Sequence, residues 1–151
     1  MEMKTKDYSE HDLDHTFDPN DSDDITRWGV LLLKLTQFQP DAESKTNAIL
    51  AAISKLEQSL VKDPFNPNTV WWLGNAYKER GLMTPDYNVA AIYFDRAIEF
   101  YELALMEEPE DQIYLKSLES TAEVKTCLAQ HAAGAENSST SYEEETTKAA
   151  E

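Results

Sequence analysis

Large, small and aromatic residues recur at helical intervals between residues 70 and 97, and this spacing constrains the fold more than any other feature. The residues are Val70, Leu73, Gly74 and Tyr77, followed by Ala90, Phe94 and Ala97. The first group follows a W-x2-L-G-x2-Y arrangement and the second an A-x3-F arrangement, which are the two halves of a 34-residue helix–turn–helix repeat. The chain is therefore expected to contain stacked pairs of helices.

A second, upstream series supports the same interpretation. It comprises Trp28, Leu31, Leu32 and Leu35, answered by Ala52, Leu56, Ser59 and Pro64. Pro64 lies six residues before Val70, the separation expected where the closing proline of one repeat precedes the next repeat. Compared with the standard repeat, the first unit has eight extra residues between its helices and the second has four. We predict a tetratricopeptide-like stack with longer loops or helices than usual.

Proline, glycine and capping residues predict about five helices in an all-α fold. Their approximate ranges are 23–37, 41–62, 66–81, 85–106 and 111–131, and the last helix would cap the stack. The sequence has only four glycines and few stretches in which Thr, Val or Ile alternate with polar residues, so it lacks the pattern typical of β-strands and their turns. Residues 1–22 are predicted to be a mostly disordered acidic arm, residues 23–131 the helical domain, and residues 132–151 a disordered acidic Ser/Thr-rich tail.

Charge and cysteine content exclude several classes of function. The net charge of −16 and a sequence pI near 4.4 would repel nucleic acid and anionic lipid, so a basic partner is favoured. The single cysteine, Cys127, indicates a reducing compartment. The longest apolar runs, 30–33 and 48–53, are far shorter than the roughly 20 residues of a membrane-spanning helix. The N-terminal segment has no apolar core typical of a signal peptide.

Catalytic and metal-binding patterns are weak in this sequence. His11 and His15 lie four apart among acidic residues, but no cysteine or third histidine lies near them. No pattern pairs a buried acid with a nucleophile, and no glycine-rich loop could hold phosphate. We therefore predict a protein with no catalytic residue, no metal and no cofactor.

In a stack of helix pairs, the first helix of each pair lines the concave face. The predicted peptide-binding residues are Thr26, Gly29, Leu33, Thr36, Gln37, Asn68, Trp71 and Asn75. This nearly uncharged surface suits the apolar face of an amphipathic helix. Gly29 is expected to leave room for a ligand side chain, and Trp71 to anchor the ligand. Alternatively Trp71 or Trp72 packs in the core; neighbours on a helix point about 100° apart, so at most one is central to the groove.

Several sequence blocks together carry a more specific resemblance. They are DSDDITRWGVLLLKLTQFQ, AISKLEQSL, VWWLGNAY, YFDRAIEFYELAL, EEP and YLKSLE. In this order they resemble the plant-type 20-kilodalton receptor subunit of the mitochondrial outer-membrane translocase, over about residues 18–120. The resemblance implies two tetratricopeptide-like motifs with insertions, a C-terminal membrane anchor, and a groove on the cytosolic side. That groove would bind amphipathic basic presequences of precursor proteins, and other translocase subunits would be further partners.

The sequence departs from that family pattern before residue 18, after about residue 120, and in having no anchor-like segment. This leaves two interpretations. One is a soluble receptor fragment, and the other is a divergent homologue that has lost its membrane attachment, with or without the import role. The favoured function is a mitochondrial import receptor at the cytosolic face of the outer membrane. The alternative is a soluble cytosolic scaffold that binds another protein. An acidic peptide ligand would need cationic groove residues, which the predicted positions do not supply.

Overall fold

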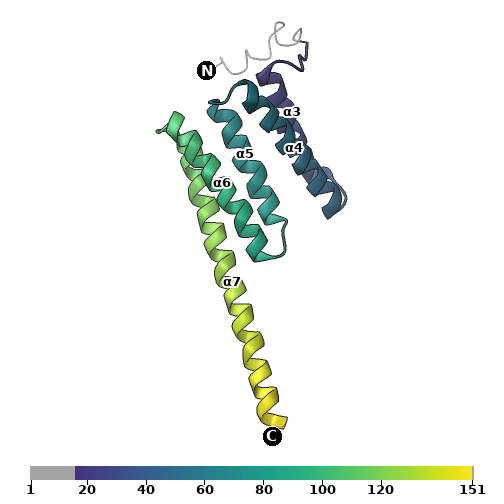
Figure 1. Cartoon of the computed structure of the whole chain (residues 1–151), viewed down its shortest axis with the longest axis vertical. Helices are drawn as coiled ribbons and strands as arrows, with labels where there is room; N and C mark the ends of the chain where they lie inside the picture. Colours follow the sequence, from purple (N-terminus) through teal and green to yellow (C-terminus); the bar gives the residue numbers. More distant parts are fainter. Residues whose placement is uncertain (1–15, 151) are drawn as a thin grey trace.

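The computed structural model describes residues 16–150, and the side-chain environments of residues 16–135. Its elements are α3 (Ser22–Leu35), the 3-10 helix η1 (Thr36–Phe38), α4 (Ala42–Lys62), α5 (Pro67–Leu82), α6 (Tyr87–Glu107) and α7 (Gln112–Ala150) (Figure 1). All regular structure within this range is helical, which confirms the predicted all-α class. Residues 1–15 of the predicted arm, including His11 and His15, lie outside the described residues.

Short polar side chains fix where the helices begin. Asp21, Asp41, Asn66 and Asp86 precede α3, α4, α5 and α6, and each accepts a hydrogen bond from a backbone amide of the first turn. Such caps satisfy amides that have no partner within the helix. At Asp41 the hydrogen bond from the Ser44 amide, 2.7 Å long, lowers the pKa of the carboxyl group. The predicted starts are thus confirmed within two residues, although α3 begins at Ser22 rather than at residue 23, and α6 at Tyr87 rather than at residue 85.

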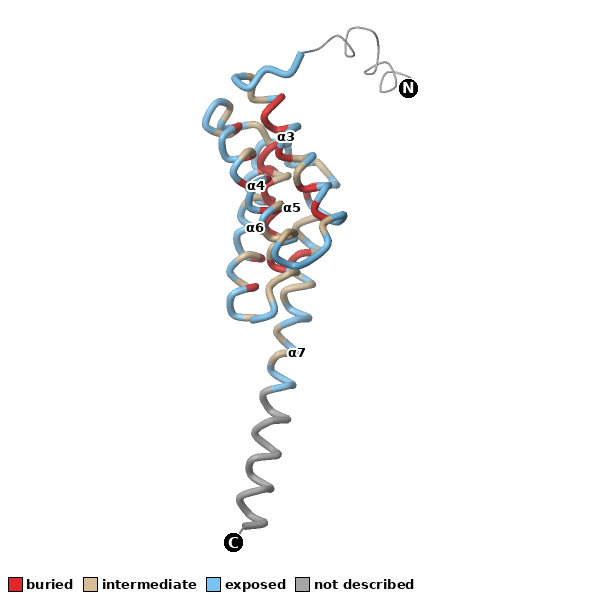
Figure 2. Tube along the Cα trace, turned by 90° about the vertical axis from the view of Figure 1, so that its right-hand side faces the viewer, coloured by how far each residue is buried: buried red, intermediate tan, exposed pale blue. Residues whose placement is uncertain are grey.

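Each helix packs mainly on its neighbours in sequence, from α3 through α7. Figure 2 shows the buried residues concentrated where these helices meet. The fully buried large side chains include Ile49, Leu56, Leu73, Phe94 and Tyr101. Most of them occupy positions that the repeat pattern assigned to the core. This order of packing is the one that stacked helix pairs produce.

The extra residues of the two units are accommodated mainly by long helices. α4 and α6 each contain 21 residues, and η1 lies between α3 and α4. α3 ends at Leu35, two residues before the predicted end near Gln37, because Thr36 begins the tighter turn of η1. Both alternatives, longer helices and a longer connection, therefore contribute in the first unit.

The end of the fifth helix was predicted wrongly. α7 does not stop near His131 but continues to Ala150, and it projects beyond the other helices toward the C-terminus (Figure 1). Residues 132–150 contain alanine and glutamate, which favour helices, and no proline. A lone Gly134 costs only about 1 kcal/mol relative to alanine. Residues 132–151 were predicted to be disordered because they lack apolar periodicity, and the helix preference of their alanine and glutamate residues was given less weight.

Two glycines of α5 permit close contact with α6. A Cβ atom at Gly74 would lie 2.5 Å from Tyr101 Cε1, and one at Gly81 would lie 2.7 Å from Phe94 Cε1. Both aromatic rings are fully buried, so neither can move aside without disturbing the core. The absence of a side chain at Gly74 therefore sets the distance between the two helices.

We predict that Gly74→Ala lowers the free energy of unfolding by about 1–3 kcal/mol, because the added methyl group overpacks the core against Tyr101. Gly134→Ala is the matched control, since a Cβ at Gly134 meets nothing within 4 Å. It should leave stability unchanged or slightly raised. Urea unfolding followed by circular dichroism measures both variants. Equal stability of Gly74→Ala and the parent chain would contradict the packing argument.

Candidate peptide-binding groove

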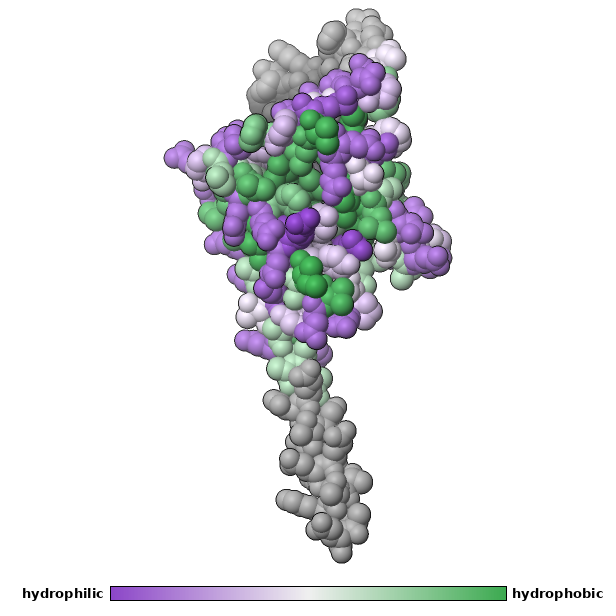
Figure 3. Space-filling model, viewed as in Figure 1, coloured by the Kyte–Doolittle hydropathy of each residue, from purple (hydrophilic) through white to green (hydrophobic). Residues whose placement is uncertain are grey.

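Two adjoining clefts lie between α3 and α5. The larger, about 540 Å³, is lined by Leu33, Lys34, Thr36, Gln37, Lys45, Trp72, Asn75, Lys78, Glu79 and Met83. The smaller, about 360 Å³, is lined by Thr26, Arg27, Val30, Leu31, Asn68 and Trp72. Because Trp72 lines both, we treat them as one groove, hereafter the α3–α5 groove. On the face drawn in Figure 3, green apolar side chains gather on the helical domain among polar ones.

Most of the predicted binding residues line this groove. Leu33, Thr36, Gln37 and Asn75 border the larger cleft, and Thr26 and Asn68 border the smaller one. Gly29 and Trp71 border neither of these two clefts. The structure thus brings together the polar and aliphatic part of the predicted set, and it places the glycine and the tryptophan elsewhere.

Gly29 faces α4 and leaves no space for a ligand. A Cβ atom there would lie 2.8 Å from Leu56 Cγ and 3.2 Å from the Ala52 carbonyl oxygen. The room that the missing side chain creates is therefore filled by α4. The expectation that Gly29 admits a ligand side chain is wrong, because the glycine serves the contact between the two helices of the first unit.

The two tryptophans of α5 point to different neighbours. Trp71 Nε1 donates a hydrogen bond to Ser117 Oγ of α7 at 2.9 Å, and its ring centroid lies 5.9 Å from that of Tyr114. Trp72 instead faces α3 and lines both clefts. The rings meet edge to face with centroids 4.8 Å apart. Adjacent helix residues point about 100° apart, so the two side chains lie on different sides of α5. Trp72, and not the predicted Trp71, lines the groove.

Thr26 belongs to a buried chain of hydroxyl groups under the smaller cleft. Its Oγ1 lies 2.6 Å from Ser59 Oγ and 2.8 Å from Thr69 Oγ1, and Ser59 Oγ donates to the Ser22 carbonyl oxygen at 2.8 Å. Because the Ser59 proton goes to that carbonyl, Ser59 accepts from Thr26, and Thr26 accepts from Thr69. Thr26 is only 6% exposed, so its main contribution is to hold α3 against α4 and α5.

Asn75 is held in place from α6. The Tyr101 hydroxyl donates to Asn75 Oδ1 at 2.6 Å, and burial raises the pKa of Tyr101 well above its usual value. The bond uses the carbonyl oxygen of Asn75, so the amide hydrogens are the donors left for a ligand in the larger cleft. An oriented amide can satisfy the polar edge of a bound helix without carrying charge.

The larger cleft has a charged border that is not part of the predicted set of binding residues. Lys34, Lys45, Lys78 and Glu79 line it, and Lys34 Nζ lies 5.7 Å from the centre of the Trp72 ring. Lys78 also donates to Ser120 Oγ on α7, at 3.3 Å. Lys45 was missed because it lies in the first turn of α4, whereas the prediction considered only the first helix of each pair.

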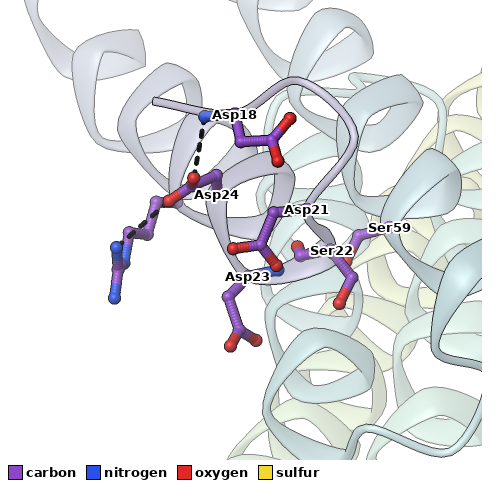
Figure 4. A network of polar contacts seen from close by, with 7 residues as sticks. Asp18, Asp21, Ser22, Asp23, Asp24 and Ser59 are labelled. Atoms are coloured by element: carbon purple, nitrogen blue, oxygen red, sulfur yellow. Dashed lines mark hydrogen bonds and ion pairs between the residues drawn. The ribbon is translucent and has the colours of Figure 1, made fainter. Parts of the chain in front are cut away.

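The start of α3, at one end of the groove, is fixed by acidic residues. The Asp18 amide donates to Asp24 Oδ2 at 2.9 Å, and Arg27 forms an ion pair with Asp24 at 3.2 Å (Figure 4). Asp24 is only 2% exposed, so this ion pair and the hydrogen bond compensate a buried charge. These contacts hold the last residues of the N-terminal arm onto α3.

In the part of the chain that the structure describes, no group of histidine, cysteine, aspartate and glutamate side chains could hold a metal ion. Among the helices that the structure describes, none combines the length and apolar character needed to cross a membrane.

An all-helical scaffold with a groove of apolar, uncharged polar and charged side chains is typical of protein-binding modules. Residues 4–150 match the family model described as "Plant specific mitochondrial import receptor subunit TOM20". The chain belongs to this family, which confirms the resemblance and the prediction that the protein is not an enzyme. The family resides at the mitochondrial outer membrane, in agreement with the predicted location.

Curated relatives from Arabidopsis thaliana support the assignment. Mitochondrial import receptor subunit TOM20-3 is 42% identical over 113 residues, which cover 74% of this chain and 55% of the relative. TOM20-1 is 42% identical over 110 residues, covering 72% and 58% respectively. TOM20-4 is 40% identical over 100 residues, covering 66% and 52%. The chain therefore spans about half the length of the curated relatives it matches.

We predict that Trp71→Ala destabilises the fold more than Trp72→Ala does. Trp71 packs against two groups of buried apolar residues, one that includes Leu56, Leu73 and Tyr101 and one formed by Val70, Ala104 and Tyr114, and it donates a hydrogen bond to α7. Trp72 packs only against the first group and borders the groove. Trp71→Ala should lower the free energy of unfolding by about 2–4 kcal/mol, and Trp72→Ala by about half as much. Thermal unfolding of both variants under identical conditions measures this. The reverse order would contradict the assignment of the two side chains.

Proposed function

We propose that the chain is a mitochondrial import receptor and that its α3–α5 groove binds the apolar face of amphipathic helical presequences. The observation that carries this proposal is the composition of the groove. Leu33, Trp72 and Met83 supply apolar surface, and Thr36, Gln37 and Asn75 supply uncharged polar groups beside it. An amphipathic helix lying in such a groove would bury its apolar stripe and satisfy its polar edges.

Family membership supports the receptor role. The relatives named above are import receptor subunits, and a receptor of this kind would meet precursor proteins and other translocase subunits.

The lysines at the border limit how a basic presequence can lie. Lys34, Lys45 and Lys78 would repel basic residues placed at the edge of the larger cleft. The basic face of the ligand must therefore point away from α3 and α5, toward solvent. The net charge of −16 would then speed the approach of a basic ligand without setting its pose. Most of the affinity would come from apolar contacts.

We expect Trp72→Ala to weaken binding of a labelled presequence by about 1–3 kcal/mol, because a groove-lining aromatic side chain is a typical anchor. Moderate salt should weaken binding only slightly, since buried apolar contacts are not screened. Fluorescence anisotropy measures both effects, and thermal unfolding checks that the variant is folded. Phe65→Ala is the matched control, because Phe65 is 74% exposed and lies between α4 and α5, outside the groove. Equal loss of affinity in both variants would contradict the groove assignment.

One observation favours a second candidate function, a scaffold that binds an acidic peptide. The three border lysines are the cationic side chains that such a ligand needs, and none of them belongs to the predicted set of binding residues. The double variant Lys34→Ala, Lys45→Ala distinguishes the candidates. It should maintain or improve binding of a basic presequence, and it should weaken binding of an acidic C-terminal peptide. Strong salt-sensitive binding of the acidic peptide, with none of the presequence, would favour the scaffold.

A further inference from the structure

The outward side of α6 carries an exposed stripe of six residues. α6 packs on α5 and α7, and its third side is open. Along that side, exposed residues recur at intervals of three and four: Val89, Ile92, Arg96, Glu99, Leu103 and Met106. Residues so spaced share one side of a helix. The four apolar members are between 39% and 75% exposed. Exposed apolar side chains that gather on one side of a helix, rather than singly, can mark an interaction site.

The α6 stripe has the same order of apolar and charged residues whether it is read from its N-terminal or its C-terminal end. Val89 and Met106 are equally far from the midpoint between Ala97 and Ile98, and so are Ile92 and Leu103. The central pair, Arg96 and Glu99, has the same midpoint but opposite charges. Within the chain their side chains approach to 4.0 Å, and both are more than half exposed.

This order is self-complementary only in an antiparallel arrangement. Two antiparallel copies of α6 would place apolar side chains against apolar ones at both ends. At the centre, Arg96 of each copy would face Glu99 of the other. A parallel arrangement would instead bring Arg96 beside Arg96 and Glu99 beside Glu99, and like charges in contact are unfavourable.

We propose that the α6 stripe is a two-fold, antiparallel contact with a second copy of this chain. In a two-fold interface every contact occurs twice, with the two partners exchanged. A stripe that binds itself must therefore be complementary to its own reversed order, as this one is. Binding to a protein of different sequence would not require that symmetry.

The contact is expected to be weak. The stripe is about 25 Å long, because 17 residues rise about 1.5 Å each, and one pair of helices buries less surface than a stable dimer of about 1,200 Å² or more requires. Glu102 beside the stripe and the net charge of −16 also repel a second copy. At physiological salt this repulsion decays within about 8 Å, so the dimer should form reversibly at high protein concentration.

Charge exchange across the contact provides the test. Sedimentation equilibrium of the full chain up to about 1 mM should show reversible dimerisation. Arg96→Glu and Glu99→Arg should each raise the dissociation constant at least about tenfold, because each puts like charges at the centre. An equimolar mixture of the two variants should associate again, since one then presents two acids and the other two bases. Labelling one variant identifies the mixed dimer.

Two further variants keep the test decisive. Ile92→Lys, at an exposed apolar position of the stripe, should abolish association. Val61→Lys should leave it intact, because Val61 is 82% exposed but lies on α4. Circular dichroism checks that every variant keeps its helical content. A monomeric parent chain, a mixture that fails to associate, or an equal effect of Val61→Lys would each overturn the proposal.

Discussion

The buried hydroxyl chain of Thr69, Thr26, Ser59 and the Ser22 carbonyl sets the position of the first three long helices. It connects α5 to α3, α3 to α4, and α4 back to the start of α3, entirely among side chains that are nearly inaccessible to solvent. Each hydroxyl has one proton, so the direction of donation is fixed, and a shift of any helix would leave a buried polar group without its partner. The α3–α5 groove lies above this chain. The hydroxyl chain holds α3 and α5 at a fixed separation, and this separation sets the width of the groove whether or not a ligand is bound.

Glycines complete this arrangement at three helix contacts. Gly29 lets Leu56 of α4 approach α3, Gly74 admits Tyr101 of α6, and Gly81 admits Phe94 of the same helix. Tyr101 then reaches past Gly74 to orient Asn75 in the groove. The repeat glycine therefore has a second consequence beyond tight packing, because the close approach that it permits brings a hydroxyl group within bonding distance of a groove residue. Core geometry and groove chemistry are coupled at this position.

The sequence predicted helix order, the approximate helix starts and most of the core, because each depends on local spacing or on chemistry that a single residue carries. Asn66 and Pro67 illustrate this, since their preference for a helix start does not depend on tertiary structure. The groove was predicted less well. A repeat template assigns Trp71 to the concave side, but the choice between Trp71 and Trp72 depends on the rotation of α5 between α3 and α7. That rotation is set by packing with residues far away in sequence. Lys45 was missed for a related reason, since the insertion places it beside the groove from another helix.

The distribution of charge explains why a strongly acidic protein can have lysines beside its groove. Net charge acts at distances comparable with the screening length, and it influences how often a basic ligand arrives. The border lysines Lys34, Lys45 and Lys78 act only at contact distance, where they would influence which face of a ligand can pack into the groove. Under the proposed function, both effects would favour a helix that is apolar on one face and basic on the other, because only the apolar face could approach Trp72 without meeting like charge. The α6 stripe contains no residue of the groove, and α5 lies between α6 and α3. Pairing through α6 would therefore leave both grooves open, and two linked sites hold a multivalent ligand longer than either site alone.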